Sequence, residues 1–155
     1  MPPRVAFFLW VTVLGKILTA ENLRKRHIII VSWCCMYKAN GESIDHLFIH
    51  CPVARELWSA VFCTFGVLWV MPQTVRELIE GWQWLKHHHN QIWTAVPHCI
   101  MCCLWRERSS RTFEDRELTI EDLKLRVFRT LFEWMQATNV ASCDSFQDFL
   151  NSCIP

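Results

Sequence analysis

Apolar side chains recur every three or four residues along most of this chain, and polar turns containing Gly or Pro separate the apolar stretches. That spacing places apolar side chains on one face of an α-helix. The pattern therefore predicts a helical protein. The predicted helices cover residues 5–14, 20–27, 52–65, 75–85, 92–113 and 120–135, and shorter helical turns are predicted at residues 44–50 and 145–152.

Residues that cap helices stand where several of these segments begin or end. Thr19 and Thr119 each precede a predicted helix, and Thr74 with Glu77 forms a capping box ahead of another. Gly66 follows a predicted helix and can adopt the left-handed conformation that ends one. These local signals agree with the periodicity about where the helices start and stop.

Three segments carry additional signals. Residues 5–14 are nearly all apolar, which favours a helix that is buried on most sides. Pro97 lies inside residues 92–113, where its ring and missing N–H predict a kink or a later helix start. Residues 27–31 are largely β-branched and predict an extended stretch that packs on the core, because no second convincing strand is available to pair with it.

Potential metal ligands gather between the extended stretch and the helix at residues 52–65. They are Cys34, Cys35, His46, His50 and Cys51. Thiolate and imidazole suit Zn²⁺, and a tight turn followed by a helical turn can bring such ligands to one tetrahedral ion. Ser43 can cap that helical turn, which places His46 and His50 on one face. The layout is that of a zinc knuckle.

One position departs from this layout. A Cys-x2-Cys pair that starts at Cys34 places its second ligand at residue 37, which is Tyr37. A phenol with a pKa near ~10 is a poor zinc ligand at neutral pH.

The predicted fold is all-α: a small helical domain with an irregular zinc-knuckle-like insert. We expect about five to seven helices around one aromatic-rich core. A zinc-knuckle-like helical region at residues 1–66 is expected to precede a C-terminal helical region at residues 67–155. The second region packs on the same core, either as a separate part or within a single domain.

Composition narrows the functional classes. The 155 residues are 52% hydrophobic and include 9 Trp and 10 Phe, so most of the chain is expected to be folded. At this density the aromatic side chains are expected in the core, and no Trp is assigned to base stacking. The net charge of +1 leaves only local patches for nucleic-acid binding.

The nine cysteines favour buried, reduced thiols over a disulfide framework, because adjacent and helix-spaced pairs recur and no secretory leader precedes them. We therefore expect an intracellular, reducing compartment, nuclear or cytoplasmic. Residues 57–75 are uncharged but contain polar positions, and their strongly apolar part is shorter than a bilayer span. No membrane association is expected.

Short motifs that occur in one order along most of the chain resemble a known family. They are Phe7-Phe8-Leu9-Trp10, Gly15-Lys16-Ile17-Leu18-Thr19, Leu23-Arg24-Lys25-Arg26, Gly41-Glu42-Ser43-Ile44-Asp45-His46-Leu47-Phe48-Ile49-His50-Cys51-Pro52, Trp58, and Leu104-Trp105-Arg106-Glu107-Arg108 with Phe113. Together they resemble the zinc-binding domain near the C-terminus of reverse transcriptases from plant non-LTR (LINE-type) retrotransposons.

The resemblance implies a zinc ion held by a Cys-x2-Cys pair and a His-x4-Cys pair. On this sequence the implied ligand positions are Cys34, residue 37, His46 and Cys51. Because Tyr37 occupies one of them, Cys35, His50 or a water is expected to complete the site. Zinc binding is then expected to be looser than at a four-ligand structural site. A second departure is Ser109, which stands where the family usually has Asn.

Nucleic acid is the partner that the resemblance implies. Arg24, Lys25 and Arg26 form the candidate phosphate-contacting patch, although an ordinary solvated turn explains these charges equally well. Arg106, Arg108 and Arg111 are further candidate point charges. RNA or DNA binding is expected to be weak, independent of sequence and sensitive to salt, because no base-reading motif accompanies them.

Other clusters favour simpler interpretations. Residues 87–89 are three consecutive histidines, but consecutive side chains diverge, so a polar loop is favoured over a metal tract. Cys99, Cys102 and Cys103 are interpreted as buried thiols, because no second ligand pair follows at zinc-ribbon spacing. Motifs for a phosphate loop, a dinucleotide site or a nucleophilic serine are lacking, so an enzyme is not expected.

Two functional hypotheses remain at this point. The first is an accessory zinc-binding domain of a retroelement reverse transcriptase, as a diverged fragment without polymerase activity that contacts nucleic acid or other parts of the polyprotein. The second is a metal-free helical protein-interaction module in which the Cys and His side chains belong to the core.

Overall fold

The computed structural model describes residues 2–39, 41–85, 91–138 and 145–154, and within them it contains helices and no β-strand. The elements are α1 (Pro3–Val13), α2 (Ala20–Lys25), the π-helical turn η1 (His46–His50), α3 (Pro52–Phe65), α4 (Val75–Leu85), α5 (Gln91–Phe113), α6 (Ile120–Ala137) and α7 (Phe146–Cys153). The prediction of an all-α fold is confirmed.

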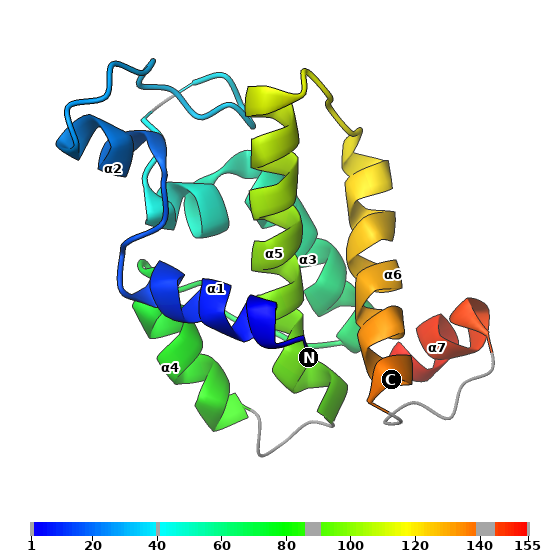
Figure 1. Ribbon diagram of the computed structural model, residues 1–155. Coiled ribbons are helices and arrows are strands. Elements are labelled where there is room, and N and C mark those ends of the chain that lie inside the picture. The colour runs from blue at the N-terminus through cyan, green and yellow to red at the C-terminus, as the bar shows by residue number, and fades with distance from the viewer. Residues whose placement is uncertain (1, 40, 86–90, 139–144, 155) are drawn as a thin grey trace.

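Helix α5 runs through the middle of the molecule, and the other helices are arranged around it (Figure 1). Helix α6 packs along α5, α1 crosses it, and α3 contacts both α5 and α6. Helix α7 packs against α6. Helix α2 and the loop that follows it lie beside the C-terminal end of α5 (Figure 1).

The predicted caps are confirmed. The Thr19 hydroxyl accepts a hydrogen bond from the N–H of Asn22, and Thr119 does the same for Asp122. At α4, the Glu77 N–H donates to Thr74 Oγ1 at 3.2 Å and the Thr74 N–H donates to Glu77 Oε2 at 3.4 Å. Gly66 ends α3 with φ of 62°, in the left-handed region that glycine favours.

The core is rich in aromatic side chains where α3, α4 and α5 meet. The rings of Trp82 and Trp93 stack with centroids 4.5 Å apart, and Trp58 packs against Trp82 at 5.7 Å. The buried indole N–H of Trp58 donates to the Phe48 carbonyl at 2.8 Å, and that of Trp82 donates to the Trp93 carbonyl at 2.9 Å. These bonds remove the cost of burying an unpaired polar group. Residues before and after Gly66 contribute to one buried cluster.

Two expectations about burial are wrong. Helix α1 is buried on one side only, because its Phe7 and Trp10 side chains are 65% and 60% exposed. Residues 27–31 do not pack on the core: Ile29 is fully exposed and Val31 is 64% exposed. Periodicity cannot reveal this, since an apolar stretch is buried only where a neighbouring element comes to cover it.

Helix α5 is continuous across Pro97 and starts before it, at Gln91, so Pro97 does not lie in the first turn. The histidine tract at residues 87–89 lies outside the described residues. No helix among the described residues has the length and apolarity that a membrane crossing requires. The division of the chain at residue 66 stays a prediction.

Candidate metal centre

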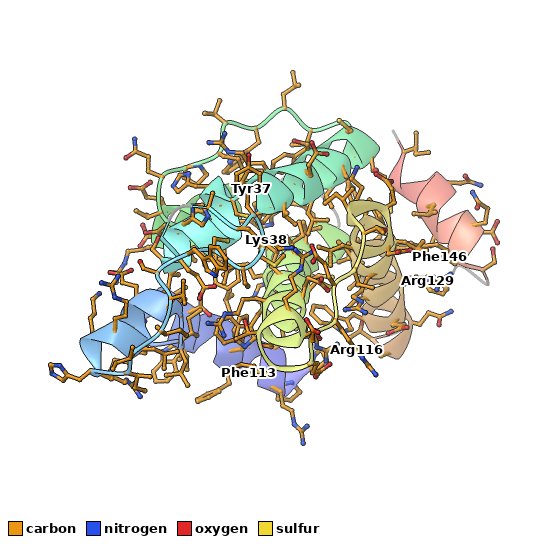
Figure 2. All side chains as sticks on the ribbon, turned by 90° about the horizontal axis from the view of Figure 1, so that it is seen from above. Tyr37, Lys38, Phe113, Arg116, Arg129 and Phe146 are labelled. Carbon is orange, nitrogen blue, oxygen red and sulfur yellow. The ribbon has the colours of Figure 1, made fainter. Side chains whose placement is uncertain are left out.

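A tight turn at residues 34–39 buries the first cysteine. The Lys38 N–H donates to the Cys34 carbonyl at 2.7 Å, and the Cys34 N–H donates to the Ala39 carbonyl at 3.4 Å, so the chain reverses within these residues. Lys38 has φ of 57°, in the left-handed region, which closes the turn. The turn leaves Cys34 fully buried, with Tyr37 exposed near its far end (Figure 2).

A π-helical turn positions the second pair. Ser43 Oγ accepts from the His46 N–H at 3.1 Å, which confirms the predicted cap. The turn then closes with a bond from the Cys51 N–H to the His46 carbonyl at 2.7 Å, five residues back, instead of the α-helical spacing. This wider turn ends at Cys51, where α3 begins. It brings the His46 and Cys51 backbones together.

The three candidate ligands converge. The donor atoms of Cys34, His46 and Cys51 all lie within 4.8 Å of one another, and the two sulfurs are 3.8 Å apart. Two thiolates bound to one Zn²⁺ at ~2.3 Å with tetrahedral angles lie about 3.8 Å apart. Both cysteines are fully buried. The spacing therefore fits a tetrahedral zinc site with three protein ligands.

His46 supplies an independent sign of a missing partner. Its Nε2 is buried and has no hydrogen-bond partner within the part of the chain that the structure describes. Leaving such an atom unpaired costs about 1–3 kcal/mol, so native structures rarely do so. A metal ion at the cluster would accept the Nε2 lone pair. The residues present therefore fit the zinc that this donor set suggests.

The two thiols share one proton in the metal-free protein. The hydrogen bond from the Cys34 thiol lowers the pKa of Cys51 to about 7, with help from the backbone N–H groups of Val53 and Ala54 at the start of α3. The same bond, together with burial, raises the pKa of Cys34. Cys51 is therefore poised as a thiolate near neutral pH, and the thiolate is the form that binds a metal.

The expected replacement ligands point elsewhere. The Cys35 thiol lies 3.8 Å from Glu42 Oε2 and 3.7 Å from the Arg108 carbonyl. Nε2 of His50 is hydrogen-bonded to the Gln73 carbonyl at 2.8 Å. Neither residue belongs to the three-residue cluster. Completion of the site by Cys35, His50 or a water stays a prediction, and completion by either side chain would require it to leave these contacts.

A buried ion pair joins the loop after the knuckle turn to α5. Nε and Nη2 of Arg108 donate to Glu42 Oε1 at 3.1 and 2.9 Å, and both side chains are no more than 3% exposed. The same carboxylate oxygen accepts from the Ala20 N–H at 2.8 Å, at the start of α2. Three separate chain segments thus meet at Glu42. The sequence does not reveal this contact, because Glu42 and Arg108 are far apart along the chain.

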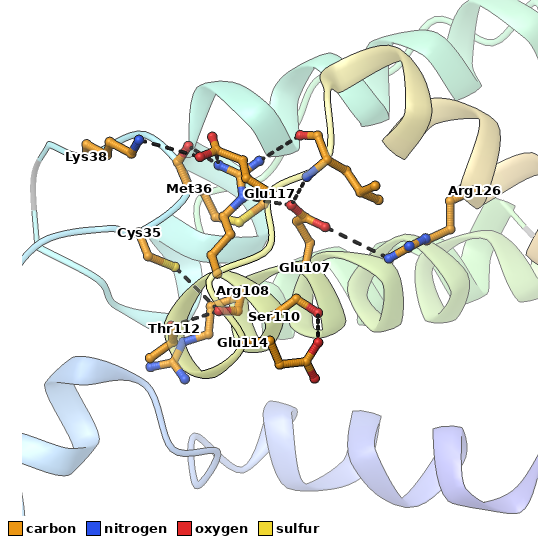
Figure 3. A network of polar contacts seen from close by, with 12 residues as sticks. Cys35, Met36, Lys38, Glu107, Arg108, Ser110, Thr112, Glu114, Glu117 and Arg126 are labelled. Atoms are coloured by element: carbon orange, nitrogen blue, oxygen red, sulfur yellow. Dashed lines mark hydrogen bonds and ion pairs between the residues drawn. The ribbon is translucent and has the colours of Figure 1, made fainter.

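A second network lies one turn further along α5 (Figure 3). Arg111 donates to Glu107 Oε1 at 2.8 Å, to the Met36 carbonyl at 3.0 Å and to the Leu118 carbonyl at 3.1 Å. The Met36 contact ties the knuckle turn directly to α5. Arg108 and Arg111 are therefore not available as the nucleic-acid contacts predicted for them.

The other predicted sites are found in two different environments. Arg24, Lys25 and Arg26 are exposed on α2 and its C-cap, and Lys25 pairs with Glu21 at 2.8 Å. The thiols of Cys99 and Cys103 are buried between α5 and α6, where they contact the Val127 carbonyl and the Thr130 hydroxyl. The interpretation of these two as buried thiols is confirmed.

Comparison with known proteins gives one match. Residues 1–58 match the protein family described as zinc-binding in reverse transcriptase. No curated protein and no solved structure matches the chain. The matched segment contains the whole Cys34, His46 and Cys51 cluster and ends inside α3, so the helices from α4 onward lie beyond it.

Proposed function

We propose that this chain is an accessory zinc-binding domain of a retroelement reverse transcriptase, with one Zn²⁺ held by Cys34, His46 and Cys51. The observation that carries the proposal is the convergence of a His46 ring nitrogen and two sulfurs at zinc-ligand spacing, together with the buried Nε2 of His46, which has no partner among the described residues. The family match over residues 1–58 supports the same class of domain. Bound zinc would balance the charge of the thiolates and fix the knuckle turn against α3.

We further propose that the chain comes from an element of the plant non-LTR type, as a diverged fragment without polymerase activity. The motifs between Phe7 and Phe113 support this assignment. Its role is then structural and non-catalytic. Its partners are RNA or DNA and other parts of the retroelement polyprotein.

Replacing Cys51 with serine should abolish zinc binding while the fold persists, because a serine can still cap α3. We expect about one zinc per purified wild-type chain and none in the variant. Inductively coupled plasma mass spectrometry measures the content. Absorption of the Co²⁺-substituted protein reports thiolate ligation. Cys63→Ser is the control, since Cys63 is exposed and lies outside the cluster. Equal zinc in Cys51→Ser and wild type would contradict the assigned ligands.

Nucleic-acid binding through α2 makes a separate prediction. Changing Arg24, Lys25 and Arg26 to Gln should weaken binding to single-stranded RNA and reduce the slope of log affinity against log salt by about 2. Fluorescence anisotropy between low and high salt measures this slope. Arg76→Gln is the control, because Arg76 is an exposed cation on α4. An affinity that does not change with salt would rule out phosphate contacts.

The second candidate function, a metal-free interaction module, is favoured by one observation. Phe7, Trp10 and Leu14 are exposed at helical spacing along α1 and its C-cap. A row of exposed apolar side chains is typical of a protein interface. Absence of zinc from the purified protein would make this the better explanation.

A further inference from the structure

Two cavities lie beside the extended segment at residues 30–33. One has a volume of about 420 Å³ and is lined by Val31 and Trp33, while the other has a volume of about 490 Å³ and is lined by Ser32. Glu42 lines both cavities, so the two cavities adjoin at this side chain. Cavities of this size hold ligands as large as a nucleotide.

The charge around the cavities favours an anion. Apart from Arg108, Arg111 and Glu42, which are held in the ion pairs described above, their linings include four cationic side chains and three acidic ones, on a chain whose net charge is only +1. Within the described residues, no carboxylate lies at ion-pair distance from Arg24 or Arg116. Lys38 has a 3.5 Å ion pair with Glu117, and both side chains are more than half exposed. Such a pair contributes little, so a phosphate can replace the carboxylate.

The cavity also presents an exposed indole. Trp33 is 51% exposed, whereas Trp58 and Trp93 in the core are at most 1% exposed. Ile30 and Val31 flank it as apolar walls. An exposed aromatic ring beside cations is the arrangement on which unpaired bases stack in single-strand binding proteins. The expectation that no Trp stacks on a base assumed that the aromatic side chains lie in the core, and Trp33 is half exposed instead.

We propose that these two cavities form a binding site for single-stranded nucleic acid. One unpaired base stacks on Trp33, and the neighbouring phosphates contact Arg116 on one side and Arg24 on the other. Lys38 on the knuckle turn and Arg116 beyond the end of α5, both labelled in Figure 2, line the smaller cavity. This site deepens the nucleic-acid role proposed above, and rests on it. It explains why a chain with little net charge can still bind a strand: stacking supplements a few phosphate contacts.

The test measures binding of a labelled 12-nucleotide RNA of mixed sequence to the zinc-loaded full chain by fluorescence anisotropy. Trp33→Ala should weaken binding about tenfold and leave the salt slope unchanged, since stacking involves no ion release. Trp33→Phe should retain most of the affinity. Arg116→Gln should reduce the slope by about 1. A fully paired RNA duplex should bind more weakly than the single strand, because its bases are not free to stack.

Matched controls separate this site from general surface effects. Trp10→Ala removes a tryptophan of similar exposure on α1, and Arg76→Gln removes an exposed cation on α4. Neither residue lines either of the two cavities, so both variants should bind the RNA like wild type. The proposal is overturned if Trp33→Ala equals Trp10→Ala, or if Arg116→Gln leaves the slope unchanged. It is also overturned if the duplex binds as tightly as the single strand.

Zinc content of the same samples separates the two proposals. A chain with one zinc and no affinity for single-stranded RNA would overturn the nucleic-acid site and leave the zinc centre standing. RNA binding that depends on Trp33 as predicted, in a chain without zinc, would overturn the zinc centre and leave the nucleic-acid site standing. Capture of a peptide library in place of RNA, with the same Trp33 dependence, would assign the cavities to a protein partner and overturn the proposal.

Discussion

Replacing Arg108 with methionine should lower the free energy of unfolding by about 3–5 kcal/mol, because it leaves the Glu42 carboxylate buried without its partner. The two side chains are only 2–3% exposed, so water cannot replace the guanidinium without opening the structure. Methionine keeps much of the side-chain volume beside Trp105, over which the guanidinium now lies at 5.1 Å. Urea unfolding followed by circular dichroism measures the change.

The matched control is Lys25→Met, which removes the cation of an ion pair whose side chains are 65% and 47% exposed. Exposed pairs contribute only about 0–1 kcal/mol, so this variant should unfold nearly like wild type. Adding Glu42→Gln to Arg108→Met should recover part of the loss, since no buried charge then remains. Equal effects of Arg108→Met and Lys25→Met would show that the Glu42 contact does not hold the loop to α5.

Replacing Tyr37 with cysteine should raise zinc affinity roughly a hundredfold or more, because it supplies the thiolate that a four-ligand site needs. Residue 37 is well placed for this, because its backbone N–H lies within hydrogen-bonding reach of the Cys34 sulfur. In excess zinc, a hundredfold gain in affinity stabilises the folded state by about 2.7 kcal/mol, so the melting temperature should rise with it.

Competition with a chromogenic chelator measures the affinity, and thermal melts with and without zinc measure the stabilisation. Tyr37→Phe is the control, since it removes the phenol without adding a ligand and should bind zinc like wild type. If Tyr37→Cys holds no more zinc than its parent, residue 37 does not occupy a ligand position. The metal-free interaction module then becomes the better interpretation.

The helices follow from local sequence. A cap such as Thr19 acts on a backbone N–H three residues away, and the apolar stripe of α3 repeats within one turn, so each signal needs no distant partner. Sequence therefore predicts where the helices lie, and the structure confirms those predictions. The same locality holds for Ser43, whose cap on His46 is visible in the spacing alone.

The candidate ligands were partly predictable. The spacing of Cys34, His46 and Cys51 selects them, because two soft ligands, a tight turn and a helical turn can converge on one ion. The spacing does not show that the turn before Cys51 is π-helical, since this geometry depends on how η1 packs against α3 and α5. It also cannot show that Cys35 and His50 face other partners.

Tertiary structure alone decided the burial of charge and the exposure of apolar surface. The sequence predicts Arg108 and Arg111 as surface cations. In the structure Arg108 donates to Glu42 and Arg111 donates to the Met36 carbonyl, and both partners are far away along the chain. The sequence predicts Trp33 as a core residue, yet its side chain is 51% exposed. A local pattern determines where a helix forms. Burial of a side chain depends on which distant element packs against it, and only the tertiary structure shows that packing.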